Sequence, residues 1–327
     1  MTLRRRTLLG AALALPVAAR AVAAAPWPAR PLRLIVVYPP GGVSDTIART
    51  LARGLEQRLG QPVVVDNRPG NGGAVGMQAL ARARPDGYTL AFSAATPLTL
   101  KPHLQKVPYA LRDFAPVAAV MSTPVLLVGT PLFTGSQFAD VVAQARAQPG
   151  ALRWATSGIA TSGHLVLEQV CLGAGVSVTH VPYKGGGQQI QDALGGEFEL
   201  LSTNLAAEQL RLVREGRFKP LALGAPARLP VLPDVPTFAE LGLPEANVSS
   251  LFGVFAAAGT PASRIARLNA LINELLGQAQ LQERLLATDN IPGGDSPGAF
   301  AQRLRHEWES NRRLAAKMAA AGPNIGS

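Results

Sequence analysis

Six short segments of this sequence are rich in glycine and hydroxyl residues and poor in side chains that carry out covalent chemistry. In chain order they read YPPGGVSD, DNRPGNGG, SAATP, TSGIATSGH, PYKGGG and STN. Backbone N–H groups and neutral hydroxyls can hold a carboxylate reversibly, above all where a segment opens a helix and meets the positive end of its dipole. No single segment is specific, but six in succession predict a binding cleft rather than a catalytic centre.

The first segment has two interpretations. Pro39–Gly42 joins an apolar strand to an amphipathic helix, and a helix N-terminus without a side-chain cap presents free N–H groups to an anion. Two glycines at this point can equally do no more than turn the strand into the helix. On this stretch alone the second interpretation is favoured.

Four side chains beside these segments are candidates for ligand contact. Asp45 either complements the helix dipole or accepts a hydrogen bond from a ligand amine or hydroxyl. Lys184, after Tyr183 at a strand end, is either a solvated loop charge, which is favoured, or a contact to a ligand carboxylate. His164 falls in the first turn of a helix, and Asn204 ends a strand as a neutral contact.

Signatures of the common enzyme classes are absent from the sequence. GNGGAVG misses the last glycine of a dinucleotide-binding G-x-G-x-x-G, where Val75 stands, and follows the second strand instead of the first. The nucleophile elbow G-x-S-x-G is absent, and Ser162 and His164 are too close along a helix start for a serine–base pair. The four histidines have no metal-ligand spacing. We therefore expect no catalytic residue, no cofactor and no metal ion.

The N-terminal 25 residues have the pattern of a secretory signal peptide. Arg4–Arg6 precede an apolar run, and Ala21–Ala23 offers a small-residue cleavage site. The basic cluster fits either general or twin-arginine export, and both routes predict a periplasmic protein. Four basic residues lie in this segment, so the net charge falls from +10 to about +6 after cleavage.

The composition of the remaining chain excludes several classes. Its basic residues are scattered, which argues against nucleic-acid binding. No later segment is apolar for long enough to span a membrane. Cys171 is the only cysteine, so an internal disulfide is excluded, and its apolar surroundings predict a place in a core.

Strand and helix patterns alternate along the first two-thirds of the chain. The first run predicts strands at 32–38, 62–66 and 88–93 and helices at 46–59 and 74–82. This βαβαβ order implies right-handed crossovers and a parallel sheet. A second run, from a strand at 125–128 to a strand at 218–223, forms another α/β unit. In such sheets the ligand lies beyond the carboxyl ends of the strands, where the six segments fall.

The last part of the chain is almost wholly helical from Ala262 to Ala320. Helices without new strands are expected to pack back on the first sheet. This predicts an α/β protein of two lobes with a ligand cleft between them, the chain crossing near Pro124 and Gly253. The first lobe comprises residues 26–123 and 252–327, and the second comprises residues 124–251.

Several stretches together closely resemble the Bug (TctC) family of extracytoplasmic solute-binding proteins, which are associated with tripartite tricarboxylate transporters. They are YPPGGVSDTIAR, GQPVVVDNRPGNGG, PDGYTL, TSGIATSGHL, VPYKGGG, LPDVPTFAELGLP and FGVFAAAGTP, in the same order over nearly the whole mature chain. The resemblance implies the type II periplasmic binding protein fold. It also implies binding of small organic acids, mostly dicarboxylates, through backbone amides, hydroxyls and ordered waters.

By position, the resemblance implies that the PPGG loop forms one wall of the site and that the helix start at Ser162 grips a carboxylate opposite. Tyr38 stands where the family usually has Phe, Ala160 replaces a glycine and Leu251 replaces a tryptophan. Residues 202–204 read Ser-Thr-Asn instead of aromatic-Asp-Asn, so the specificity pocket does not carry over. The expected ligand-binding residues are Tyr38, Pro40, Gly41, Gly42, Asp45, Gly72, Thr96, Ser157, Thr161, Ser162, Gly163, His164, Tyr183 and Asn204.

The expected function is capture of a small organic carboxylate by a monomeric periplasmic protein, for uptake by the membrane subunits of a tripartite tricarboxylate transporter. Two alternatives stay open. The ligand-closed form could be handed to a membrane histidine kinase as a signal. The chain could also be an exported α/β hydrolase that uses Ser162 or Ser157 as its nucleophile.

Overall fold

The computed structural model describes residues 27–183 and 186–321, so the signal segment (residues 1–25) and Lys184 lie outside its described part. The strands are β1 (Leu32–Val36), β2 (Val63–Asn67), β3 (Thr89–Ala94), β4 (Phe114–Gly129), β5 (Arg153–Thr156), β6 (Thr179–Pro182), β7 (Leu200–Asn204), β8 (Lys219–Gly224), β9 (Ser249–Ala257) and β10 (Ile291–Pro292). The helices are α1 (Val43–Leu59), α2 (Ala74–Ala81), α3 (Thr96–Thr99), α4 (Lys101–Leu104), α5 (Phe138–Ala147), α6 (Ser162–Ala174), α7 (Gly186–Gly195), α8 (Ala207–Arg214), α9 (Ala262–Leu276), α10 (Ala279–Leu286) and α11 (Pro297–Ala321). Single 3₁₀ turns are η1 (Asn71–Gly73), η2 (Leu111–Asp113) and η3 (Pro244–Ala246).

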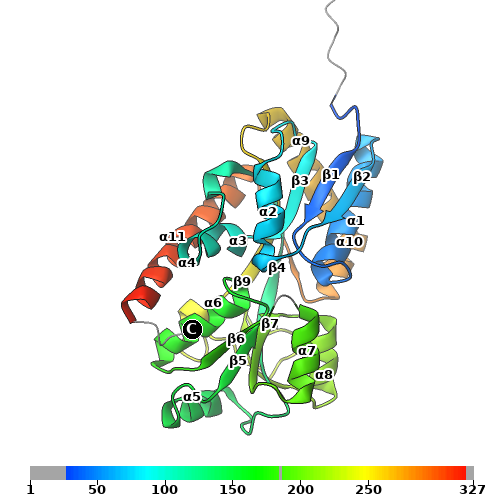
Figure 1. Ribbon diagram of the computed structural model, residues 1–327. Coiled ribbons are helices and arrows are strands. Elements are labelled where there is room, and N and C mark those ends of the chain that lie inside the picture. The colour runs from blue at the N-terminus through cyan, green and yellow to red at the C-terminus, as the bar shows by residue number, and fades with distance from the viewer. Residues whose placement is uncertain (1–26, 184–185, 322–327) are drawn as a thin grey trace, which may run out of the picture.

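The strands of the described part form one continuous sheet that serves two lobes. Its order is β2-β1-β3-β9-β4-β7-β5-β6, with β8 and β10 also paired to β4. Figure 1 shows β1, β2 and β3 in the upper lobe and β5, β6 and β7 in the lower lobe, each flanked by helices. The predicted two-lobed α/β architecture is confirmed.

The first lobe contains the predicted parallel βαβαβ unit. β1 pairs in parallel with β2 on one side and with β3 on the other. Its side chains alternate between two cores: Leu34 and Val36 pack in the cluster that includes α1, and Ile35 and Val37 pack in the cluster that includes α2. Helices therefore cover both faces of β1, which explains why the strand reads as a continuous apolar run.

Two long antiparallel strands, β4 and β9, connect the lobes. They pair up to Pro124, after which β4 continues beside β7 and β8 of the second lobe. The sequence predicted only residues 125–128 of β4, because prolines interrupt its earlier pattern. The structure places Pro116 beside a register shift in the pairing with β9, where the absence of an N–H group is tolerated.

The second lobe is the predicted second α/β unit. β5 pairs in parallel with β6 and β7, and β4 closes this part of the sheet in the antiparallel sense. One core cluster contains the buried side chains of Trp154 and Val170, and another contains those of Phe198 and Phe218. The two clusters belong to opposite faces of the strands, since neighbouring residues Leu200 and Leu201 of β7 divide between them.

The C-terminal helices pack on the first lobe, as predicted. Leu268 and Leu275 of α9 share a core with α1 and β1, and Phe300 of α11 packs on Phe255 of β9 with ring centroids 5.2 Å apart. The expectation that this section adds no strand was wrong in one detail. The two residues of β10 pair with β4 at Ser122 and Met121.

A small apolar cluster lies where the lobes meet. It joins Leu100 from the first lobe and Leu314 of α11 to Ala160 and Leu165 of the second lobe. α11 therefore contacts both lobes. The domain boundaries at 123/124 and 251/252 stay a prediction, although sheet pairing changes partners next to Pro124. Within residues 27–183 and 186–321, no helix has the length and apolar character needed to cross a membrane.

Gly253 generates a first testable prediction, because β9 touches its neighbours most closely there. A Cβ at this position would lie 2.3 Å from Phe300 Cζ and 2.7 Å from the Ala118 carbonyl oxygen. We expect Gly253→Ala to lower the free energy of unfolding by about 1–3 kcal/mol through this overlap, measured by urea or thermal unfolding. Gly195→Ala is the control, since no atom lies within 4 Å of a Cβ there and alanine suits a helix end. Equal stability of the two variants would contradict the packing.

Candidate functional site

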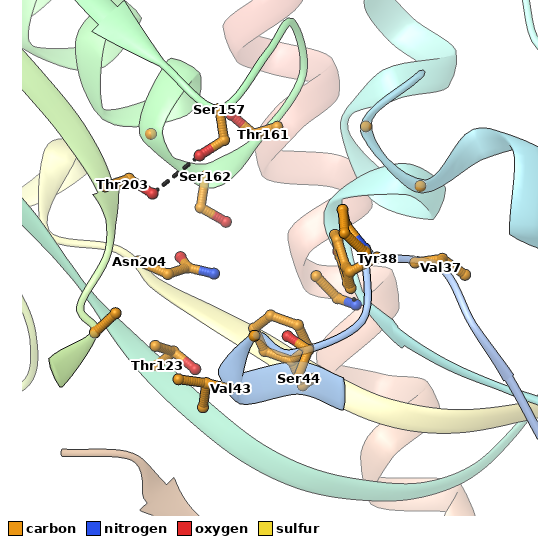
Figure 2. Close-up of a pocket in the computed structure, with 18 of the residues that line it drawn as sticks. Val37, Tyr38, Val43, Ser44, Thr123, Ser157, Thr161, Ser162, Thr203 and Asn204 are labelled. Atoms are coloured by element: carbon orange, nitrogen blue, oxygen red, sulfur yellow. Dashed lines mark hydrogen bonds between the residues drawn. The ribbon is translucent and has the colours of Figure 1, made fainter. Parts of the chain in front are cut away.

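A cavity of about 500 Å³ lies between the lobes. Figure 2 shows Tyr38, Val43 and Ser44 on one side of it and Ser157, Ser162 and Asn204 on the other. Residues from β4 and β9 complete the lining where the strands cross. The cavity therefore has walls from both lobes, as the predicted cleft requires. Its lining residues are Val37–Ser44, Pro69, Gly70, Gly72, Gly73, Ala94, Thr96, Met121, Thr123, Ser157, Thr161–Gly163, Gln189, Ile190, Thr203–Ala206, Glu208, Gln209 and Phe252.

Eleven of the fourteen predicted binding residues line this cavity. They are Tyr38, Pro40, Gly41, Gly42, Gly72, Thr96, Ser157, Thr161, Ser162, Gly163 and Asn204. The other three, Asp45, His164 and Tyr183, are absent from the lining. Each of the three is held by protein partners instead, and two of them support the loops that line the cavity.

The Pro39–Gly42 loop is fixed from behind by Asp45. The Asp45 carboxylate is 4% exposed and accepts hydrogen bonds from Gly41 N (3.0 Å), Arg49 Nε (2.9 Å) and Asn67 Nδ2 (2.8 Å). Burial alone would raise the pKa of Asp45, but these hydrogen bonds together lower it below its usual value. Asp45 is thus an ionised anchor for the loop and is not itself part of the cavity lining.

The helix behind this loop begins earlier than predicted. α1 starts at Val43, three residues before the expected start, because Gly42 already occupies the N-cap position in an extended conformation. Gly41 has φ +87°, a conformation that side chains other than glycine rarely adopt. No side chain caps the N-terminus of α1, so the first N–H groups of the helix stay available beside the cavity.

The opposite wall is the start of α6. Thr161 is its N-cap residue, yet the Thr161 hydroxyl donates to the Gly158 carbonyl (2.8 Å) and makes no cap. Gly163 packs directly on β7, because a Cβ there would lie 2.2 Å from the Ser202 carbonyl oxygen. The N–H groups of this first turn therefore meet the cavity without a side-chain cap, which is the arrangement that binds anions at helix N-termini.

Hydroxyl and amide side chains surround the start of α6. Ser157 Oγ lies 2.9 Å from Thr203 Oγ1, as the dashed line in Figure 2 shows. Ser250 Oγ of β9 lies 2.5 Å from Ser162 Oγ and also contacts Asn204 Oδ1. This network joins the helix start, the end of β7 and a crossing strand, so it presents neutral hydrogen-bonding groups at fixed positions.

His164 lies below this wall and outside the lining, with 3% exposure. Its Nδ1 accepts the Ala160 N–H (3.2 Å), and its Nε2 lies 3.2 Å from Glu168 Oε1. The ring also stacks on His180 with centroids 4.5 Å apart. The reason is helical spacing: His164 and Glu168 share the buried face of α6. His164 therefore holds the loop before α6, where Ala160 adopts φ +61°.

His180 and Tyr183 are also turned into the second lobe. Burial, with the neighbouring His164, lowers the pKa of His180 to about 3, and its Nε2 lies 2.8 Å from Thr156 Oγ1. The Tyr183 hydroxyl donates to Asp192 (2.7 Å), and its ring packs edge-on against Phe198. Neither side chain reaches the cavity lining.

Several lining residues were missed at the sequence level. Met121, Thr123 and Phe252 lie on the crossing strands, and they could have been found by asking which residues of β4 and β9 face the cleft. Gln189 and Gln209 lie near the starts of α7 and α8 and carried no signal of their own. Among the described lining residues, Glu208 alone has a charged side chain.

Two α/β lobes, a pair of strands that cross between them and a cavity at their junction define the two-lobed periplasmic binding protein fold. Residues 47–296 match the model of the tripartite tricarboxylate transporter family receptors (TctC), and this chain belongs to that family. The resemblance seen in the sequence motifs is therefore confirmed.

Similar proteins are known both by sequence and by structure. Protein BugT of Bordetella pertussis is 38% identical over 292 residues, which cover 88% of this chain and 89% of BugT. The structure of Rpa4515 from R. palustris with adipate is 32% identical, with a TM-score of 0.79, and the match covers 89% of this chain and 98% of that chain. MatC (Rpa3494) from Rhodopseudomonas palustris with bound malate is 28% identical, with a TM-score of 0.81, and the match covers 88% of this chain and 100% of that chain.

The anchoring role of Asp45 generates a second prediction. Asp45→Ala removes the buried carboxylate that accepts part-buried hydrogen bonds from Gly41, Arg49 and Asn67. Hydrogen bonds to a charged group are the stronger ones, so we expect the free energy of unfolding to fall by about 2–3 kcal/mol at pH 7. Because the pKa of Asp45 is lowered in the folded state, this difference should be complete above the ordinary aspartate pKa of about 3.9 and vanish as pH falls through the folded-state value. Denaturant unfolding of both proteins across this pH range measures it.

Asp66→Ala provides the matched control for Asp45. Asp66 pairs with Arg68 (2.8 Å) and Arg33 (3.8 Å), but its side chain is 29% exposed. Pairs of this kind contribute about 0–1 kcal/mol. If Asp66→Ala lowered the free energy of unfolding as much as Asp45→Ala, the hydrogen bonds of Asp45 would contribute no more than an exposed ion pair.

Proposed function

We propose that this chain is a periplasmic solute-binding protein that captures a small organic carboxylate between its lobes and delivers it to the membrane subunits of a tripartite tricarboxylate transporter. The observation that carries the proposal is the uncapped start of α6, with Ser162 and Gly163 in the wall of a cavity between two lobes. Family membership supports the transporter partner.

The size and the chemistry of the cavity suit a small acid. A volume of about 500 Å³ lies in the range of small-molecule sites. Its walls offer backbone N–H groups and hydroxyls, which stabilise a carboxylate without a permanent ion pair. Adipate and malate, the compounds named with two structures of similar sequence, are both dicarboxylates. We infer that one ligand carboxylate binds the α6 start and that the Pro39–Gly42 loop covers the rest.

Catalytic turnover is not part of the proposal, and the contacts of the two candidate nucleophiles support this choice. In the described part of the chain, Ser157 Oγ contacts Thr203 and Gln189, and Ser162 Oγ contacts Ser250. A serine nucleophile needs a base within hydrogen-bonding reach. His164, the nearest histidine in sequence, is occupied by Ala160 and Glu168 instead.

The cellular setting forms the remainder of the proposal. The pattern of residues 1–25 supports export to the periplasm, where a receptor of this family would meet its ligand. We propose that the exported protein acts as a monomer, because the cavity is walled by two lobes of one chain. No cofactor takes part.

A third prediction tests the ligand class. We expect adipate, malate or another di- or monocarboxylate to raise the melting temperature, while neutral sugars and amides do not. A ligand at a hundred times its dissociation constant adds about 2.7 kcal/mol of stability. A screen by thermal shift, followed by calorimetric titration, measures the effect. Stabilisation by sugars or amides, with none by any acid, would refute the carboxylate class.

A fourth prediction places the acid beside Asn204. Figure 2 shows Asn204 between Ser162 and Thr123, on the second-lobe side of the cavity. Asn204→Asp adds a negative charge there, and like-charge repulsion should weaken binding of the best acid by at least about tenfold. Asn204→Ala removes the amide without adding charge and should weaken the binding free energy of the acid by only about 0.5–1.5 kcal/mol. Equal affinities of the two variants would mean that the acid binds elsewhere.

A further inference from the structure

Lys101 is a buried cation that no acidic group in the described structure pairs with. The residue begins α4 and is 0% exposed. Its Nζ donates one hydrogen bond, to the Ile159 carbonyl oxygen of the opposite lobe (3.3 Å). A buried ammonium is costly unless a negative charge and further hydrogen bonds compensate it. The described residues supply one carbonyl oxygen and no ion pair.

The ammonium lies directly behind the wall of the cavity. Gly72 and Thr161 both line the cavity. A Cβ built on Gly72 would lie 3.5 Å from Lys101 Nζ, 3.3 Å from the Ile159 carbonyl oxygen and 3.8 Å from Thr161 Cγ2. These atoms therefore converge on one point at the seam between the lobes. Since glycine has no side chain, the two loops can close around the ammonium there.

The cavity needs a positive charge if its ligand is an acid, and its own lining provides none. Glu208 is the one charged side chain among the described lining residues, and it is negative. Arg49 lies behind the Pro39–Gly42 loop and already donates hydrogen bonds to Asp45 (2.9 Å) and Asn67 (2.9 Å). Lys101, by contrast, keeps two of its three N–H groups without a protein acceptor in the described structure.

We propose that Lys101 determines specificity for acids: its buried ammonium acts as the counter-charge of a ligand carboxylate across the wall formed by Gly72 and Thr161. This inference rests on the proposed function and adds a residue that touches neither the ligand nor the lining. The interaction is Coulombic and acts through a wall of protein atoms, where charges are screened less than in water. The hydrogen bond to Ile159 gives Lys101 a second effect, since it joins the lobes in the arrangement that encloses the ligand.

The proposal has a consequence for proton binding. Burial lowers the pKa of Lys101. An anion nearby favours the charged form and raises that pKa again, so binding takes up protons at a pH between the two values. The affinity for an acid must then decrease as pH rises through this window.

Two other titratable groups near α4, His103 and Glu307, titrate below the lysine range. Burial lowers the pKa of His103, on α4 itself, below 6.5, and burial raises that of Glu307, on the facing α11, to about 7. His164 and Glu168 contact each other beneath the loop that contains Ile159. Proton uptake that persists above the ordinary titration range of histidine and carboxyl groups therefore reports on Lys101.

The test uses Lys101→Met in the mature protein, with adipate, malate and the best acid of the thermal-shift screen as probes. We expect the dissociation constant to rise by about ten- to a hundredfold, the size of effect that one poorly screened charge can produce. Calorimetry in two buffers of different ionisation enthalpy, repeated over a series of pH values above the histidine range, should detect proton uptake by the wild type and none by the variant. The ligand-free variant should melt at a higher temperature, because the uncompensated charge is gone.

Two control variants separate charge from packing. Lys101→Arg keeps the charge but stays protonated, so its affinity for the acid should not change over the same pH series. Lys219→Met removes a half-buried lysine that donates to Phe133 and Gly135 in the second lobe, away from the cavity lining. It should lower stability and leave affinity unchanged.

The outcomes decide between the possibilities. Unchanged affinity of Lys101→Met, or absence of proton uptake by the wild type at every pH of that series, overturns the counter-charge while the proposed function stands. A lower melting temperature of the ligand-free variant overturns it as well and leaves Lys101 as a latch between the lobes. If Lys101→Met does not fold, the pH dependence of the wild type against Lys101→Arg decides alone. Failure of the wild type to bind any acid overturns both this inference and the proposed function.

Discussion

The antiparallel pairing of β4 with β9 is the constraint on which the rest of the structure depends. Beyond Pro124, β4 leaves β9 and continues with β7 and β8, so one strand belongs to the hydrogen-bonded sheets of both lobes. The two lobes must therefore meet where these strands cross. Met121, Thr123 and Phe252 line the cavity at that place, while loops far apart in the sequence form its walls. The position of the site follows from the strand pairing, and its chemistry follows from the loops.

Both walls use the same physical arrangement. In each, a buried ionisable side chain accepts a backbone N–H and so fixes a glycine-rich loop: Asp45 accepts from Gly41, and His164 accepts from Ala160. The ionisable side chains of Asp45 and His164 are thus already hydrogen-bonded inside the lobes. What remains in the described lining is largely neutral, namely backbone amides, hydroxyls and the amides of Gln189, Asn204 and Gln209, with Glu208 as the one charged side chain. Such a surface binds an anion without requiring that a permanently charged lining be desolvated when the cavity is empty.

The sequence was sufficient for the parallel βαβαβ unit, because β1 is apolar on both faces and α1 has a clear helical stripe. It was sufficient for most lining segments, since loops at the carboxyl ends of parallel strands meet at one edge. It gave no indication that Asp45, His164 and Tyr183 lie outside the cavity lining, because the direction of these side chains depends on tertiary contacts that spacing does not encode. It failed also for the first part of β4, where Pro116 hides a strand that a register shift makes possible. Lys101 gave no signal, because its burial is created by the opposite lobe.

α11 has a mechanical consequence that follows from its length and its contacts. Its N-terminal part is fixed to the first lobe through Phe300 and Leu304, while Leu314 packs on Ala160 and Leu165 of the second. A helix is stiff over this distance, so α11 moves with the first lobe as one body while its C-terminal part contacts the second lobe. Any change in the angle between the lobes must make Leu314 slide across the start of α6. The apolar area that Leu314 shares with the second lobe therefore depends on that angle.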